Sequence, residues 1–135
     1  RQSAITGDID PIKSSIKPRD IIKAQSTINE IYVDEKVEDY VLNLVFATRN
    51  PENYNLDDLS QLIQFGASPR ATINLILAAK ARAFLEHRGY ITPEDIRYIG
   101  QEVLCHRIIL TYEAEAEELT SYDVIQRLFE SIEIP

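Results

Sequence analysis

Apolar residues recur at helical spacing along most of the chain. In residues 35–49 they occupy positions i, i+3, i+4, i+7 and i+8, which is one face of an amphipathic helix. These positions hold Val37, Tyr40, Val41, Leu44 and Val45. Asp34 precedes the segment as a suitable N-cap, and Asn50-Pro51 ends it. We therefore predict a helix between these two signals.

Comparable patterns predict helices on both sides of this one. A helix beginning near Pro18 carries Ile21, Ile22 and Ile28. Two later segments open with a threonine three residues before an aspartate, the spacing of a capping box. The first such pair is Thr92 and Asp95, and the second is Thr120 and Asp123. The apolar residues that follow are Ile96, Ile99, Val103 and Leu104 in the first segment, and Val124, Ile125, Leu128, Phe129 and Ile132 in the second.

The most apolar helix is predicted from Ala71 to about Arg88, with Gly89 as its C-terminal stop. Its apolar residues surround much of its circumference, so we expect this helix at the centre of a bundle. Short extended segments are expected at 31–33 and 90–91. The predicted fold class is mainly α, a bundle of about five helices with at most two or three very short strands.

Residues 1–16 lack periodicity and predict a linker, so that residues 17–135 form the folded domain. The length of 135 residues fits one domain. The chain contains no methionine and starts without a signal peptide. We therefore expect it to be part of a longer protein.

The net charge of −8 opposes binding to a phosphate backbone, so nucleic acid is not an expected partner. One cysteine, Cys105, fits a reducing, cytoplasmic location, and we expect it to be a buried small hydrophobe. No apolar run approaches the roughly 20 residues of a membrane span.

The sequence lacks the residue patterns that several common types of site require. The four glycines do not have the spacing of a phosphate-binding loop. Residues 31–35 resemble a strand that ends in two acids and would hold magnesium, but Asp34 is better explained as a helix cap. Two histidines and one cysteine do not make a metal-ligand set, and no catalytic residue is predicted. The adjacent Cys105 and His106 would point apart on a helix.

Arg70 is the most informative residue. We expect Ser68 to cap the helix and Pro69 to start it, which places Arg70 in the first turn. A cation there is unfavourable by about 0.3–1 kcal/mol, because the helix N-terminus is already positive. A bound anion would reverse this effect. The structural alternative is an ion pair with Asp57 or Asp58.

Other basic residues have simpler explanations. His106 and Arg107 follow a predicted helix and would complement its negative end, although contact with a neighbouring subunit is an alternative. Arg82, Arg88 and Arg97 lie on polar helix faces, where solvation or weak surface ion pairs are expected. The acidic residues of 113–118 are expected to form a solvated face or loop.

Three motifs together resemble those of MoxR-type AAA+ ATPases. Residues 66–71, GASPRA, resemble the sensor-2 motif of that family. Residues 88–96, RGYITPEDI, and 103–108, VLCHRI, are similar to the next two signatures, and the ending IEIP resembles the family's usual close. The similarity covers about residues 17–135.

The resemblance implies that this chain is the C-terminal helical lid, and that Arg70 reaches the γ-phosphate of ATP. ATP and Mg²⁺ would be held by an AAA+ core that precedes the chain, so no cofactor is expected on the lid alone. The implied partners are that core, neighbouring subunits of a ring and von Willebrand factor A-domain proteins. The parent would be a chaperone-like ATPase.

Two other functions stay open at this point. The chain could be a stand-alone helical interaction module in which Arg70 is only structural. An enzymatic activity of the isolated chain is a weaker third alternative, because no acid–base or nucleophile pair stands out.

Overall fold

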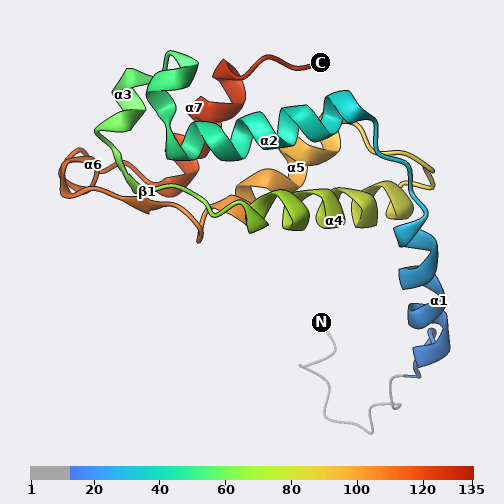
Figure 1. The fold of residues 1–135 in the computed structure, drawn as a ribbon. Helices are drawn as coiled ribbons and strands as arrows, with labels where there is room; N and C mark the ends of the chain where they lie inside the picture. The colour runs from blue at the N-terminus through green and yellow to red at the C-terminus, as the bar shows by residue number, and fades with distance from the viewer. Residues whose placement is uncertain (1–12) are drawn as a thin grey trace, which may run out of the picture.

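The computed structural model describes residues 13–135, and most of this part is helical (Figure 1). Five helices have eleven residues or more, in agreement with the predicted number. They are α1 (Pro18–Asn29), α2 (Glu35–Arg49), α4 (Arg70–Leu85), α5 (Pro93–Leu104) and α7 (Ser121–Ser131). Shorter elements are the 3-10 helix η2 (Pro51–Tyr54), α3 (Asp57–Ser60) and α6 (Tyr112–Ala116). Most of the predicted linker, residues 1–16, lies outside the described residues.

The hydrophobic core lies between α2, α4, α5 and α7. The predicted apolar faces of α2 and α7 are buried in it. The buried line of α4 consists mainly of alanines, namely Ala71, Ala79 and Ala83 together with Leu75. Small side chains let a neighbouring helix approach closely, and α4 packs most extensively against α5.

The predicted N-terminal caps of α2, α5 and α7 are confirmed. Asp34 accepts a hydrogen bond from the Lys36 N–H at 2.9 Å, which supports its interpretation as a cap rather than a magnesium ligand. Thr92 with Asp95 and Thr120 with Asp123 both form capping boxes. These starts were predictable because every partner lies within three residues.

Short extended segments join parts of the chain that are distant in sequence. The strands β1 (Ile63–Phe65) and β2 (Ile109–Leu110) form an antiparallel pair, with Ile63 opposite Leu110. The segments expected at 31–33 and 90–91 make one parallel bridge, between Tyr32 and Tyr90, rather than strands. No strand was predicted in the region of β1.

The C-terminal end of α4 differs from its prediction. The helix ends at Leu85, and the left-handed residue that follows is His87, with φ of 57°, rather than Gly89. The Arg88 N–H donates to the Ala83 carbonyl at 2.8 Å, and the His87 N–H donates to the Phe84 carbonyl at 3.0 Å. This pair of bonds is a Schellman motif, which turns the chain sharply toward α5.

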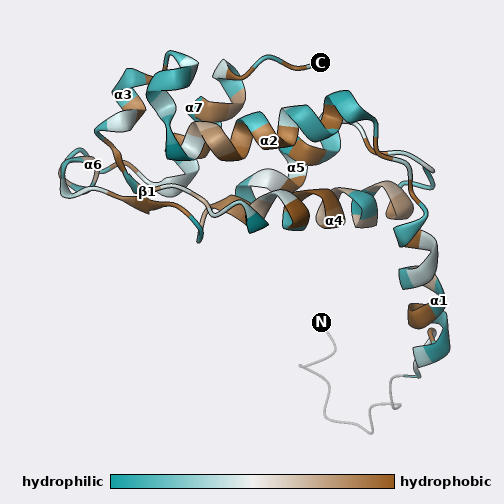
Figure 2. Ribbon diagram, in the orientation of Figure 1, coloured by the Kyte–Doolittle hydropathy of each residue, from teal (hydrophilic) through white to brown (hydrophobic). Residues whose placement is uncertain are grey.

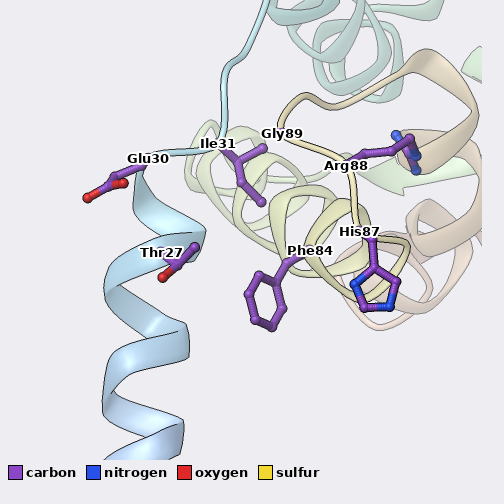
Figure 3. A pocket seen from close by; sticks show the side chains of 7 residues that line it. All are labelled: Thr27, Glu30, Ile31, Phe84, His87, Arg88 and Gly89. Carbon is purple, nitrogen blue, oxygen red and sulfur yellow. The ribbon is translucent and has the colours of Figure 1, made fainter.

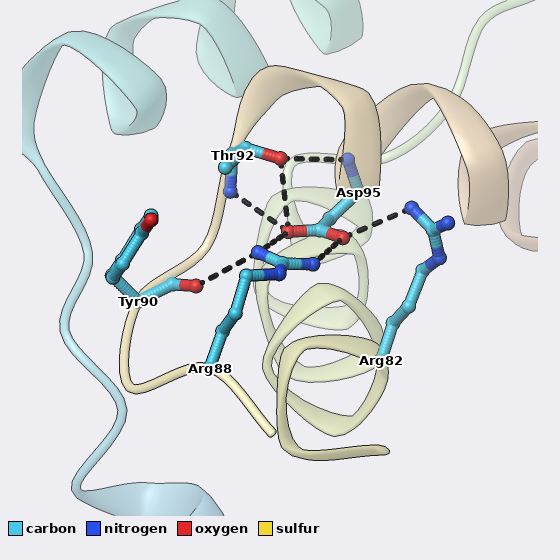
Figure 4. A network of polar contacts seen from close by, with 5 residues as sticks. All are labelled: Arg82, Arg88, Tyr90, Thr92 and Asp95. Atoms are coloured by element: carbon cyan, nitrogen blue, oxygen red, sulfur yellow. Dashed lines mark hydrogen bonds and ion pairs between the residues drawn. The ribbon is translucent and has the colours of Figure 1, made fainter. Parts of the chain in front are cut away.

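That turn brings two arginines onto one buried carboxylate (Figure 4). Arg82 donates to Asp95 at 2.9 Å, and Arg88 donates to both Asp95 oxygens at 2.6 and 2.8 Å. Asp95 is fully buried, whereas each arginine side chain keeps about a quarter of its surface exposed. Solvation or a weak surface ion pair was expected for Arg82 and Arg88, but both arginines pair with a buried carboxylate and so join α4 to the start of α5.

Arg97, the third of these basic residues, is only partly exposed. Its guanidinium lies 5.8 Å from the centre of the Phe129 ring, within the range of a cation–π contact. Arg82 makes a closer contact of this kind with Tyr98, at 3.9 Å. Aromatic rings thus cover part of two basic side chains that were expected in water.

Replacing Asp95 by asparagine should destabilise the fold by about 3 kcal/mol, because it leaves two cations without their counter-ion. Thermal or urea unfolding of the chain, followed by circular dichroism, measures this loss. Asp123→Asn is the matched control, since Asp123 has the same capping-box position but no arginine partner among the described residues. If both variants lose the same stability, the cap alone explains the effect.

The pH dependence of stability should also change. Burial raises the pKa of Asp95, but hydrogen bonds from Arg88 and Thr92 outweigh burial and hold the pKa below its ordinary value of 3.8. A lowered folded-state pKa adds stability that is fully present above 3.8 and is lost as pH falls through the folded value. As pH decreases below about 4, the free energy of unfolding of Asp95→Asn should therefore fall less steeply than that of the unsubstituted chain. Equal slopes would contradict this expectation.

Candidate functional site

The candidate site lies at the N-terminal end of α4, where the loop 66–69 crosses the end of α2. Thr48 is buried there, and its hydroxyl donates to the Val45 carbonyl at 2.6 Å. The same hydroxyl accepts a bond from the Ala67 N–H at 2.9 Å. Arg49 adds a bond to the Ala67 carbonyl at 3.2 Å. Two consecutive residues of α2 therefore hold one residue of the loop by both of its backbone groups.

Gly66 is required by the close approach of this loop. A Cβ atom at this position would collide with the Thr48 carbonyl group and with the Cα of Arg49. These are backbone atoms, so a small rotation of a side chain cannot relieve the clash. The glycine in the GASPRA motif thus permits the contact that fixes where α4 begins.

Arg70 is the first residue of α4 and is exposed. Within residues 13–135 its guanidinium forms no ion pair, and Asp58 instead pairs with Arg127 at 3.3 Å. The structural alternative of an Arg70 pair with Asp57 or Asp58 is therefore not observed. The first turn of α4 contains no acidic residue that would offset this charge.

Ser68 and Pro69 support the helix start in a different way from the prediction. The residue next to the helix is Pro69, and no side chain caps the helix. The Ser68 carbonyl accepts from the Ala71 N–H at 2.8 Å, and the Pro69 carbonyl accepts from the Thr72 N–H at 3.1 Å. The expected hydroxyl cap by Ser68 is wrong. Because two first-turn N–H groups are already bonded, an anion here would depend chiefly on the Arg70 guanidinium.

His106 and Arg107 lie beyond the end of α5. The Arg107 Nε donates to the Val103 carbonyl at 2.8 Å, which is the expected role of a cation at a helix C-terminus. His106 is exposed. Its Nδ1 is 3.9 Å from the Cys105 sulfur, a contact too long and too weak to indicate a catalytic pair. Cys105 is partly rather than fully buried and packs against the core.

A pocket lies near the C-terminal end of α4, the opposite end of the helix from Arg70 (Figure 3). It has a volume of about 420 Å³ and lies between α1 and the turn after α4. Its lining consists of Thr27, Glu30, Ile31, Phe84, His87, Arg88 and Gly89. It does not include any residue of the GASPRA motif, so the pocket and the exposed arginine are separate features.

No three histidine, cysteine, aspartate or glutamate side chains among residues 13–135 are grouped so that they could hold a metal ion. None of the helices found there is long and apolar enough to cross a membrane.

Comparison with known protein families identifies the family of this chain. The family model of the AAA lid domain matches residues 58–128, which include the loop 66–69, α4 and α5. The chain belongs to the AAA lid domain family.

Similarity to individual proteins identifies the group within this family. The chain is 36% identical over 123 residues to the chaperone MoxR1 of Mycobacterium tuberculosis, covering 91% of this chain and 33% of that protein. It is 34% identical over 118 residues to the protein MoxR of Methylorubrum extorquens, covering 83% and 34%. A crystal structure of a presumed ATPase from Cytophaga hutchinsonii aligns with a TM-score of 0.84 and 42% identity, over 87% of this chain and 36% of that one. Within its family, the chain is the lid of a MoxR-type AAA+ ATPase.

The matched relatives are much longer than this chain. The chain spans about a third of the length of the curated relatives that it matches.

Gly66→Ala tests how the start of α4 is fixed. We expect a loss of about 1–3 kcal/mol in the free energy of unfolding, since the added methyl group meets backbone that cannot yield. Urea unfolding measures the change. Gly89→Ala is the control, because a Cβ there meets no atom within 4 Å. A loss of similar size in both variants would argue against the close contact as the cause.

Proposed function

We propose that this lid senses a nucleotide that is held by another part of the protein, and that Arg70 is the sensing residue. The observation that carries the proposal is an exposed arginine at the first turn of a helix, without an acidic partner in the described chain. The helix N-terminus makes this charge unfavourable until an anion arrives. The residues 66–71 that present Arg70 lie inside the matched family segment.

The residues of this chain fit such an anion through geometry and charge. Arg70 offers a planar guanidinium, which binds phosphate oxygens through two parallel hydrogen bonds. Thr48 and Gly66 hold the loop before it, so the position of the helix start does not depend on Arg70. ATP would supply the terminal phosphate, with Mg²⁺ bound by residues outside this chain.

The sensing step is a shift between arrangements of the lid. When Arg70 contacts a phosphate, charge-assisted bonds favour the arrangement in which α4 faces the nucleotide. Hydrolysis and release remove that phosphate. The Arg70 charge at the helix N-terminus is then unfavourable again, and the arrangement in which α4 faces the nucleotide is no longer favoured. The lid thereby converts the nucleotide state into a change of position.

The wider function follows from similarity to relatives rather than from this lid. MoxR1 is named a chaperone, and we propose a chaperone-like, ATP-driven remodelling role for the parent of this chain. Ring assembly, cooperation with von Willebrand factor A-domain proteins and a cytoplasmic location belong to the same proposal. His106, exposed beyond α5, is a candidate for contact with a neighbouring subunit.

Arg70→Ala in the full-length protein tests the sensing role. We expect ATP turnover or ATP affinity to fall by about 10- to 100-fold, the effect of losing hydrogen bonds to a charged group. Arg70→Lys should recover part of the loss, since it keeps the charge but not the two-bond geometry. Steady-state hydrolysis and equilibrium nucleotide titration provide the measurements.

Two controls make this result specific. Arg127→Ala removes another exposed arginine, from α7, and should leave turnover unchanged. Melting of the Arg70→Ala protein should be unchanged or slightly higher, since no partner in the described chain is lost. Unaltered turnover and affinity in Arg70→Ala would exclude nucleotide sensing and favour a structural interaction module.

A further inference from the structure

Apolar side chains reach the surface in several parts of the described chain. One of these is α4, where Ile73 is 58% exposed and Leu77 is 47% exposed. The prediction that α4 lies at the centre of the bundle is therefore wrong, and Figure 2 shows hydrophobic colouring along much of this helix. Another is a pocket of about 230 Å³ between α3 and α7. None of residues 66–71 lines this pocket, so it is distinct from the candidate nucleotide-sensing site.

Four apolar side chains line the pocket between α3 and α7. They are Leu59, Leu62, Leu119 and Val124. Leu59 and Val124 belong to the hydrophobic core, whereas Leu62 and Leu119 are partly exposed. A Schellman motif after α6 brings Leu119 there: Glu118 has φ of 58°, and the Leu119 N–H donates to the Ala114 carbonyl at 3.0 Å. Backbone hydrogen bonds therefore hold this part of the apolar lining in place.

The segments around the pocket carry the entire net charge of the chain. Residues 50–69 and 108–126 together contain 8 of the 22 acidic residues and no lysine, arginine or histidine. The other 14 acidic residues equal the 14 lysines and arginines in number. All eight acidic side chains in these two segments are exposed. The net charge of −8 is thus concentrated in two segments instead of being spread over the chain.

The fold places these two segments side by side. The strand β1 from the first segment pairs with β2 from the second. The Thr111 N–H donates to the Leu62 carbonyl at 2.9 Å, and the Thr111 hydroxyl donates to the Gln61 carbonyl at 2.8 Å. Figure 1 shows α3, α6 and β1 together at one end of the lid. The acidic residues therefore gather at the end of the lid that contains the pocket.

Charged side chains also line the pocket itself. Two of them are the carboxylates of Asp58 and Asp123, and the third is the guanidinium of Arg127. Arg127 pairs with Asp58 at 3.3 Å, but both side chains are more than half exposed. A pair of this kind is weak, so a cation from a partner can replace Arg127 beside Asp58. The charge around the apolar lining favours a positively charged ligand.

We infer that this pocket binds a segment of a partner protein in which one apolar side chain is flanked by lysines or arginines. The apolar side chain fills the pocket and replaces water, and the cations meet the surrounding carboxylates. The volume of about 230 Å³ is below the roughly 300–1,000 Å³ of small-molecule sites, so the pocket fits one side chain better than a cofactor. The same charge repels nucleic acid and the acidic end of a second copy. This inference does not depend on Arg70.

Peptide binding to the full-length protein tests the inference. The probe is a fluorescein-labelled pentapeptide with phenylalanine between two pairs of lysines, and fluorescence anisotropy measures its affinity. One control peptide has glycine in place of phenylalanine, and another has glutamates in place of lysines. We expect the probe to bind about tenfold more tightly than the glycine peptide, because the pocket buries its aromatic ring. The glutamate peptide should not bind. Failure of the probe to bind, or equal affinity for the probe and either control, would overturn the inference.

Two substitutions test whether the peptide occupies this pocket. Leu119→Ser should weaken binding of the probe about fivefold, and Asp58→Asn should weaken it about threefold. The matched controls are Leu42→Ser and Asp39→Asn, which replace an exposed leucine and an exposed aspartate of α2 that do not line the pocket. They should leave the affinity unchanged. Equal losses in the pocket variants and their controls would contradict binding at this place. Asp58→Asn alters only an exposed side chain, so it remains informative if Leu119→Ser misfolds.

Dilution distinguishes a partner protein from a second copy of the chain as the occupant. Affinity for the probe that is the same in the oligomer and in the diluted monomer supports a pocket that is free for a partner. Binding that appears only after the oligomer dissociates shows that another copy fills the pocket, and it overturns the inference.

Discussion

The contact between the end of α2 and the loop 66–69 decides where α4 begins. Thr48 and Arg49 bind both backbone groups of Ala67, and Gly66 lets the two backbones come close enough for these bonds. Because backbone contacts hold the loop, Arg70 can remain exposed at the first turn. The position of the candidate sensing residue thus depends on residues that would never touch a ligand.

The far end of α4 is held by a different kind of interaction. Asp95 is buried between Arg82 and Arg88, and it also caps α5 through Thr92. A carboxylate in this position is costly to bury, and the cost is offset only when its partners are in place. The helix is consequently fixed at both ends, one by close backbone contact and the other by charge.

Two features of α4 are unfavourable in the lid by itself. A cation stands at the positive end of the helix, and apolar side chains at positions 73 and 77 face water. Both features lie on the same side of the helix. A partner that carried an anion would remove the first of these costs, which supports the proposal that Arg70 senses a nucleotide.

Local interactions explain what the sequence determined about this protein. The five long helices, the caps at Asp34, Thr92 and Thr120, and the place of Arg70 in a first turn all follow from residues within one or two turns of one another. The resemblance to MoxR-type ATPases was also contained in short motifs. Each of these signals depends only on residues close together in the sequence, so it could be interpreted without knowledge of the tertiary structure.

Only the tertiary structure decided which exposed or polar residues have partners. Arg82 and Arg88 were expected in water or in weak surface ion pairs, but the left-handed turn at His87 brings Asp95 to both of them. The sequence left Arg70 with two alternatives, an anion site or an ion pair with Asp57 or Asp58, and in the structure Asp58 pairs with Arg127 instead. Periodicity showed that α4 is apolar around much of its circumference, but not which side its neighbours leave exposed. These outcomes depend on how segments far apart in the chain pack together, which local spacing does not encode.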